Sequence, residues 1–178
     1  MAKTPKLRKM LNDVNADYIQ SFMRLIETQS KETIAKWCVN YALTHVLPLW
    51  SGEFPEDSRP ATALTAANDF LSGNKKLVDA KKQILECRAT AREAEGNHIA
   101  QGAARTIDAA ASTIHNSAGS ISIAFYGALT IAYKQKGLDA TWEVLEQAAI
   151  EECLKMKDSF TGIMVADEPN PAKINWGC

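Results

Sequence analysis

Polar side chains that could support chemistry recur at helical spacing between residues 101 and 115. They stand at intervals of four, three, four and three: Gln101, Arg105, Asp108, Ser112 and His115. At 100° per residue they occupy about 80° of one helix face. This face is either exposed to solvent, as on most surface helices, or buried as a polar seam against Arg88 and Arg92. If it lined a cleft, Arg92, Arg105, Asp108 and His115 could surround a small anionic ligand in an enzyme.

A second charged motif is the turn Pro55-Glu56-Asp57-Ser58-Arg59-Pro60. Its two prolines restrict the backbone, and the arginine between them cannot lose its charge. Such a turn is costly to order unless its charges have fixed partners. We therefore expect Arg59, or the Glu56 and Asp57 carboxylates, to contact Arg92, Arg105 or Asp108 and hold the two halves of the chain together. A turn that projected into solvent with free charges would instead favour a role in binding a partner.

Signatures of metal binding and catalysis are weak. Glu95 and His98 match one Glu-x-x-His motif of a di-iron bundle, but such a site needs two, and Gly96-Asn97 interrupts the helix between them. The four cysteines are far apart and lack zinc-site spacing. Nucleophile elbows and glycine-rich phosphate loops are absent, and the adjacent Glu151 and Glu152 point about 100° apart. We expect no enzyme activity, no metal and no cofactor.

The charge balance excludes some classes of partner. The formal net charge is −1 and the isoelectric point is near 6.3, which gives no electrostatic reason to expect nucleic acid. The basic N-terminus lacks the apolar stretch of a secretory signal. No apolar run approaches the roughly 18 residues needed to span a bilayer. We expect a cytoplasmic protein without a nucleic-acid or membrane partner.

Hydrophobic periodicity is helical almost throughout, and the 178 residues are enough for one sizeable core. Glycine, asparagine and proline punctuation predicts an all-α, single-domain antiparallel array of seven or eight helices over residues 1–178. The expected helices cover residues 5–12, 15–28, 31–49, 60–72, 77–94, 98–115, 121–136 and 140–158, followed by an irregular tail at 159–178. Thr4-Pro5 begins the first helix, Ser30 caps the third, Pro48 ends or kinks it, and Asp139 caps the last.

The strictest pattern predicts a helical hairpin from Leu77 to His115. Gly96 suits the left-handed position that ends one helix, and Asn97 suits the N-cap of the next. The hairpin core should be filled by Ile84, Ala91, Ala103, Ile107 and Ala110. Most of the 27 alanines lie between residues 61 and 149, and small contact residues let helices approach closely. Such an alanine-rich core leaves little room for a buried cofactor.

Several of these motifs together resemble a known family. They are Leu47-Pro48-Leu49-Trp50, the turn from Pro55 to Pro60 with Ala63-Leu64 after it, Ala89-Thr90-Ala91-Arg92-Glu93-Ala94, Ala103-Ala104-Arg105, and Thr113-Ile114-His115 with Tyr126. Over residues 35–135 this order is similar to the helical "putative immunity protein" family of bacterial toxin–immunity loci. The family pattern carries a further basic residue and further histidines where this chain has Ala61, Ala109 and Gly119.

The resemblance implies a small cytoplasmic bacterial protein that binds and neutralises a cognate toxin without catalysis. Two other functions stay open from the residues alone. One is a structural or regulatory homo-oligomer with a self-complementary apolar surface. The other is the enzyme built on Arg92, Arg105, Asp108 and His115. A flat apolar patch would favour the oligomer, and an open concave pocket lined by the polar face would favour the enzyme.

Overall fold

Helices form all the regular secondary structure between residues 6 and 177, the part of the chain that the computed structural model describes. The expected all-α fold is confirmed. Seven continuous helical segments lie in this range: α1 (Asp17–Ile26), α2 (Lys31–Tyr41) with the π-helical Ala42–Val46 and α3 (Leu47–Glu53), α4 (Arg59–Leu71), α5 (Leu77–Glu93), α6 (His98–Ser112), α7 (Ser120–Ser122) with the π-helical Ile123–Ala128 and α8 (Leu129–Lys136), and α9 (Trp142–Thr161).

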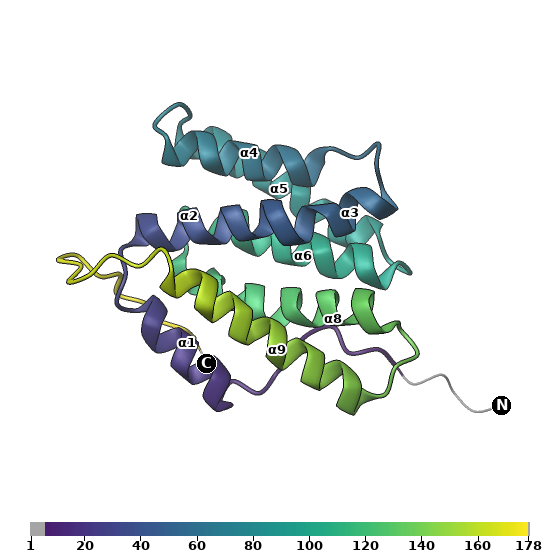
Figure 1. Cartoon of the computed structure of the whole chain (residues 1–178). Coiled ribbons are helices and arrows are strands. Elements are labelled where there is room, and N and C mark those ends of the chain that lie inside the picture. Colours follow the sequence, from purple (N-terminus) through teal and green to yellow (C-terminus); the bar gives the residue numbers. More distant parts are fainter. Residues whose placement is uncertain (1–5, 178) are drawn as a thin grey trace.

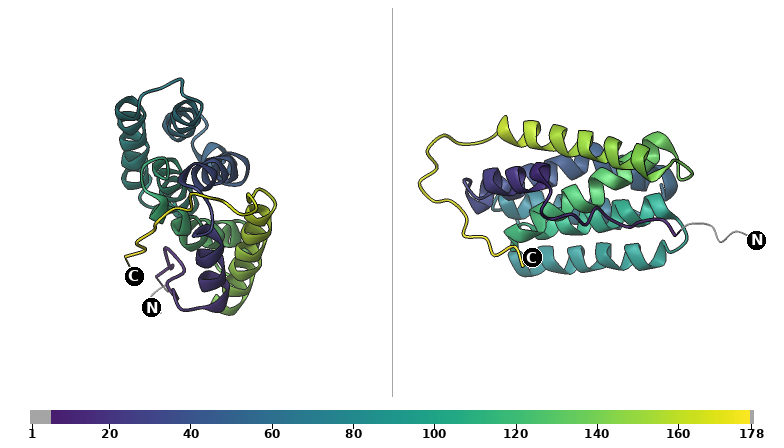
Figure 2. Two further views of the ribbon diagram at one scale, coloured as in Figure 1. Left: turned by 90° about the vertical axis from the view of Figure 1, so that its left-hand side faces the viewer. Right: turned by 90° about the horizontal axis from the view of Figure 1, so that it is seen from below.

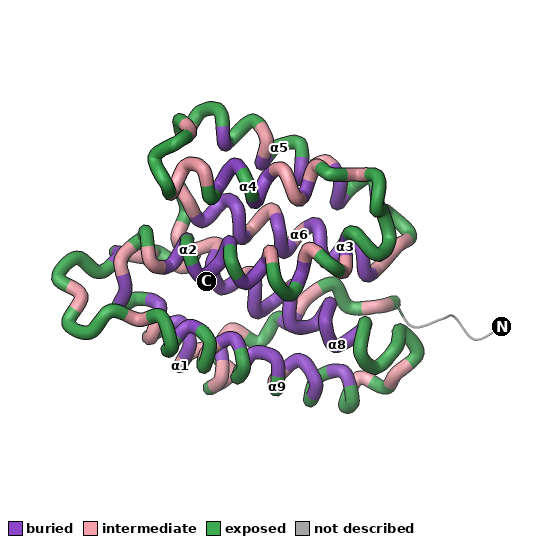
Figure 3. The backbone as a smooth tube through the Cα atoms, turned by 45° about the horizontal axis from the view of Figure 1, so that its top comes forward, coloured by how far each residue is buried: buried purple, intermediate pink, exposed green. Residues whose placement is uncertain are grey.

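The helices run nearly parallel or antiparallel to one another in stacked layers (Figure 1). The α4–α5 pair lies at one side, α2 and α6 lie in the middle, and α8, α9 and α1 lie at the other side, as the end-on view shows (Figure 2). Helix α6 packs against α2, α3, α4, α5 and α8. Buried positions therefore run along α6, whereas exposed positions alternate with buried ones on α5 and α9 (Figure 3).

Small side chains allow α6 to occupy the centre. Ala100, Ala103, Ala104, Ala110 and Ala111 are each 0% exposed. Two glycines face threonines of the opposite helix, Gly102 against Thr130 and Gly127 against Thr106. A Cβ on Gly102 would overlap Oγ1 of Thr130, and a Cβ on Gly127 would lie 2.9 Å from Cγ2 of Thr106. The crossing of α6 with the α7–α8 segment is therefore closer than any residue with a side chain permits.

The predicted hairpin is formed by α5 and α6. Gly96 has φ +93° and Asn97 accepts a hydrogen bond from the backbone N–H of Ala100 at 3.0 Å, so both turn residues act as expected. The five core residues predicted for the hairpin are all buried. Ser30 also caps its helix as predicted, because its hydroxyl accepts from the backbone N–H of Thr33 at 3.2 Å.

The helix predicted for residues 5–12 is wrong over its described part, since residues 6–12 are not helical. Thr4-Pro5 lies outside the described residues. The backbone of this segment bonds to the body of the protein instead: Leu11 N–H donates to the carbonyl of Phe125 at 2.9 Å. The carbonyl of Arg8 accepts from the ring of His98 at 3.1 Å and from the hydroxyl of Tyr133 at 3.2 Å. These tertiary bonds replace the local ones of a helix.

Two predicted helix boundaries also differ. Pro48 does not end its helix, which continues to Glu53 after the π-helical stretch Ala42–Val46. The wider π turn, in which Leu47 N–H bonds to the carbonyl of Ala42, relieves the clash that a proline ring causes in a regular α turn. Asp139 is not the cap of α9, because residues 137–140 form a turn and Thr141 occupies the N-cap position.

Two long-range polar contacts join the N-terminal part of the chain to its C-terminal part. Gln29 is 1% exposed and bonds to both backbone groups of Val165: Nε2 donates to the carbonyl at 3.1 Å and Oε1 accepts from the N–H at 2.7 Å. In the core, the hydroxyl of Tyr41 on α2 donates to Oε1 of Glu152 on α9 at 2.6 Å. Burial and this hydrogen bond raise the pKa of Tyr41. Glu152 is thus a buried acceptor, whereas its neighbour Glu151 is exposed.

Replacing Gly102 with alanine should destabilise the protein. The new methyl group has no space beside Thr130, so α6 and α8 must separate, at a cost of about 1–3 kcal/mol. Chemical denaturation measures the difference. Gly52→Ala is the matched control, because no atom lies within 4 Å of its added Cβ and its helical position gains up to about 1 kcal/mol from the higher helix propensity of alanine. Equal stability of the two variants would contradict this close crossing.

Glu152→Ala should lower the free energy of unfolding by about 1–3 kcal/mol, because it leaves the buried Tyr41 hydroxyl without an acceptor. Glu152→Gln keeps an acceptor oxygen and should lower the free energy of unfolding by less than Glu152→Ala does. The exposed neighbour supplies the control, since Glu151→Ala should change stability by less than about 0.5 kcal/mol. A Glu152→Ala variant as stable as Glu151→Ala would show that the buried hydrogen bond contributes nothing.

Candidate functional site

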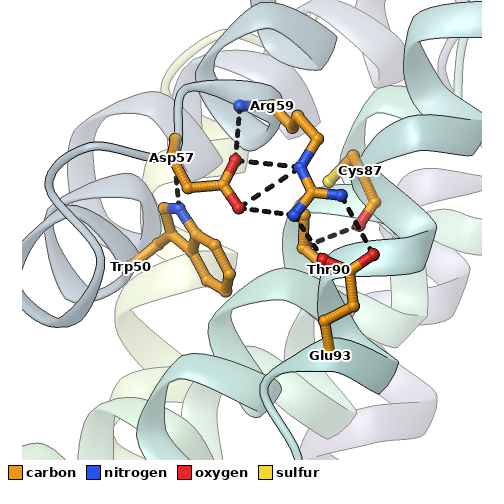
Figure 4. A network of polar contacts seen from close by, with 6 residues as sticks. All are labelled: Trp50, Asp57, Arg59, Cys87, Thr90 and Glu93. Atoms are coloured by element: carbon orange, nitrogen blue, oxygen red, sulfur yellow. Dashed lines mark hydrogen bonds and ion pairs between the residues drawn. The ribbon is translucent and has the colours of Figure 1, made fainter.

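The charged turn before α4 is ordered by its own aspartate. Asp57 Oδ1 accepts from the backbone N–H of Arg59 at 3.1 Å and from Nε of the same residue at 3.0 Å, and Oδ2 accepts from Nη2 at 2.6 Å. The indole N–H of Trp50 donates to the Asp57 carbonyl at 2.9 Å (Figure 4). Hydrogen bonds from Arg59 lower the pKa of the Asp57 carboxyl and raise that of the guanidinium. The turn therefore holds the Arg59 guanidinium, with its fork of N–H donors, in a fixed orientation.

The other edge of that fork binds the α5–α6 hairpin. Arg59 Nη1 donates to Oε1 of Glu93 at 3.1 Å and Nη2 donates to Oε2 at 2.5 Å (Figure 4). The expected contact between the turn and the hairpin is present, but the predicted partners Arg92, Arg105 and Asp108 are wrong. Successive residues on a helix point about 100° apart, so Glu93 faces α4 while Arg92 faces away.

The remaining residues of the turn lie differently. Pro60 is buried in the first turn of α4, where its missing N–H costs nothing. Glu56 is exposed and forms no ion pair with another residue of the 6–177 range. The turn is thus anchored through Asp57 and Arg59, and Glu56 is left on the surface.

The polar face of α6 contacts α5 on one edge. Asp108 accepts from Nε of Arg88 at 3.0 Å and from Nη2 at 3.3 Å, and the hydrogen bond raises the pKa of Arg88. Gln101 Nε2 donates to the carbonyl of Ala91 at 2.7 Å. The Asp108 side chain is 19% exposed and that of Arg88 is 53% exposed. The face is therefore a part-buried seam on its α5 side and open to solvent elsewhere.

A pocket of about 380 Å³ opens beside this seam, between α5, α6 and the α7–α8 segment. Its polar lining consists of Arg88, Arg92, Gln101, Arg105, Asp108, Ser122 and Tyr126. Four of the predicted site residues, Arg92, Arg105, Asp108 and Tyr126, are thus brought together. His115 is exposed and, like the buried Ser112, lies outside this lining, so the pocket contains only part of the predicted stripe.

The pocket is strongly positive. Three arginines and one aspartate line it, and that aspartate is already bound by Arg88. Among residues 6–177, neither Arg92 nor Arg105 forms an ion pair. Two histidines outside the pocket also have lowered pKa values, chiefly through partial burial. Lys81 and Arg88 add to this effect at His115, and Arg105 and Lys9 add to it at His98.

Residues 6–177 contain no group of three or more histidine, cysteine, aspartate or glutamate side chains arranged to hold a metal ion. In the same range no helix has the length and apolar character to cross a membrane. What the described fold does offer is an all-helical scaffold with an arginine-rich pocket. These two features describe a helical protein with an open, arginine-lined pocket.

The model of the family described as "Imm-5 like putative immunity protein" matches residues 24–159, which is more than half of the chain. The chain therefore belongs to this family, as the sequence motifs indicated. The matched region contains the charged turn, the hairpin and every residue that lines the pocket. Comparisons with curated proteins and with solved structures give no match.

Sequence reasoning missed three contributors to these contacts: Glu93, the carbonyl of Asp57 with its Trp50 donor, and Ser122 at the pocket. Of these three, only Glu93 could have been predicted from the sequence. On a helical wheel of α5, Asp79, Glu86 and Glu93 form one acidic row, while Lys81, Arg88 and Arg92 form a basic row roughly 140° away. An arginine at the start of α4 must meet the acidic row if α4 packs on that side, and α4 does pack against α5.

Arg59→Ala should lower the free energy of unfolding by about 1–2 kcal/mol, because the Arg59 side chain is only 34% exposed and its guanidinium bonds two carboxylates. The pKa of Asp57 is lowered in the fold, so its share of this stability is complete above the unfolded pKa near 4 and is lost as the pH falls towards the lower folded value. Denaturation of both proteins from pH 7 to pH 3 should show the difference narrowing in acid.

The control for this experiment is Lys36→Ala, which removes an exposed ion pair with Glu32 one helical turn away. Its effect should stay within a few tenths of a kcal/mol. If Arg59→Ala cost no more than Lys36→Ala, the turn would not anchor the hairpin, and contact with a partner would be the better explanation of its charges.

Proposed function

We propose that this chain is a bacterial immunity protein that binds and neutralises a cognate toxin in the cytoplasm. The observation that carries the proposal is membership of the immunity-protein family over residues 24–159. Three buried cysteines without disulfides, Cys38, Cys87 and Cys153, suit a reducing compartment. The rigid hairpin and its open, positive pocket supply a surface for a partner protein.

The chemistry of the pocket favours binding over catalysis. Arginine stays protonated at neutral pH, so Arg92 and Arg105 can hold an anion but cannot accept a proton from it. Asp108 already accepts two hydrogen bonds from Arg88. His115, the side chain best suited to acid–base work, lies outside the pocket lining. We therefore assign Arg92, Arg105 and Tyr126 to partner contact, and Asp57, Arg59 and Pro60 to support of the hairpin. Glu56 and His115 are exposed, and neither lines the pocket.

The test begins with capture of the partner. The full chain, immobilised as bait, should retain one protein from the cells that produce it, and mass spectrometry identifies that protein. The captured protein alone should arrest the growth of a host cell, and co-expression of this chain should restore growth. An unrelated protein of similar size, produced at equal level, controls for non-specific effects of co-expression.

Two results would contradict the proposal. The first is a captured protein that has no effect on growth when it is expressed alone. The second is a toxic partner whose toxicity persists in the presence of this chain at equal or higher amounts.

A further inference from the structure

We infer that the pocket between α5, α6 and the α7–α8 segment binds a carboxylate group, supplied by an acidic side chain of the toxin. The inference rests on the proposed function for the source of the carboxylate. The evidence for the site itself comes only from the side chains that line the pocket. Arg92 reaches it from α5, Arg105 from α6, and Tyr126 from the π-helical stretch between α7 and α8.

The first argument is an excess of unpaired positive charge. Arg88 and Asp108 neutralise each other through two hydrogen bonds, at 3.0 Å and 3.3 Å. Arg92 and Arg105 are left without a carboxylate among residues 6–177. A guanidinium presents a planar fork of donors that matches the two oxygens of a carboxylate, so two such forks beside one pocket favour an anion there.

The second argument is preorganisation. The backbone that carries Arg92 is fixed by its neighbour Glu93, which is held by Arg59, and by Arg88 one turn earlier, which is held by Asp108. Arg105 stands on the buried central helix α6. The helices therefore need not move to admit a ligand, which lowers the free-energy cost of binding.

The third argument is the shape and lining of the pocket. The small side chains of Ala91 and Ala109 leave a space of about 380 Å³ between the arginines, and the hydroxyls of Ser122 and Tyr126 border it. This volume is in the range of about 300–1,000 Å³ that organic ligands occupy. The pocket therefore has room for a glutamate or aspartate side chain together with part of its backbone, and more room than a bare inorganic ion requires.

The site is tested first with small probes. Glutarate, a dicarboxylate, and inorganic phosphate are each titrated into protein labelled with 15N at arginine, and the Nε–Hε signals of the side chains are followed by NMR. Saturable shifts of Arg92 and Arg105, with tighter binding of glutarate than of phosphate, are the expected result. Arg92→Gln and Arg105→Gln should each weaken glutarate binding about tenfold, since each removes one charged fork.

Two further variants keep this test interpretable. Lys82→Gln removes the same charge from the exposed face of α5 but outside the pocket, and should leave binding within about twofold of the original. Arg105→Lys keeps the charge and removes the fork, and should give an intermediate loss. Equal effects of Lys82→Gln and Arg105→Gln, or tighter binding of phosphate than of glutarate, would overturn the assignment of a carboxylate site.

The source of the carboxylate is tested with the captured toxin. The Arg92→Gln/Arg105→Gln double variant should lose at least about tenfold in affinity for it, while Lys82→Gln should not. A double variant that still binds the toxin fully would overturn the docking inference and leave the immunity function intact. If the chain captures no toxin yet binds glutarate through both arginines, the immunity function fails and the anion site stands.

Discussion

The close crossing of α6 with its neighbours is the constraint on which the rest of the fold depends. Gly102 lies against Thr130 and Gly127 lies against Thr106, so each helix presents a gap where the other presents a branched side chain. The threonine hydroxyls donate to carbonyls of their own helices, Thr106 to Gly102 and Thr130 to Tyr126, which leaves their methyl groups to pack across the crossing. A central helix this tightly enclosed can expose only a narrow strip, and the polar face beginning at Gln101 is that strip.

Helix α5 covers one side of this strip, and two ion pairs set its orientation. In one pair α5 supplies the carboxylate, and in the other it supplies the guanidinium. Its Glu93 receives Arg59 from the turn before α4, and its Arg88 receives Asp108 from α6. Neither pair is fully buried, so the main effect of each is not on overall stability. Each pair instead favours one rotation of α5 about its own axis over other rotations. A small rotation of α5 about its axis would break both pairs, because they lie on different flanks of the helix. Arg92 projects between the two flanks, and for that reason its charge stays free.

Local features of the chain were predictable from sequence, and features that depend on helix rotation were not. The turn at Gly96-Asn97 and the cap at Ser30 were predicted correctly because each depends on the backbone geometry of a few adjacent residues. The partner of Arg59 was predicted wrongly because the choice between positions 92 and 93 depends on which side of α5 meets α4. Residues 6–12 were assigned to a helix because periodicity cannot reveal that Leu11 bonds to the distant carbonyl of Phe125. Helical spacing predicted the grouping of Arg105 and Asp108 with Arg92, but it also placed His115 there and gave no sign of Tyr126, which comes from a distant helical segment.

The distribution of polar groups separates the parts of the chain that hold the fold from the part available to a partner. Charges that join one helix to another are paired: Asp57, Arg59 and Glu93 form one network, and Glu152 accepts from Tyr41 within the core. Charges around the α5–α6 pocket exceed their partners by two arginines. Both arginines line the same pocket, with Arg92 exposed and Arg105 half-buried, and neither forms an ion pair among residues 6–177. A carboxylate bound in this pocket would face two guanidinium groups, and this electrostatic complementarity would favour its binding.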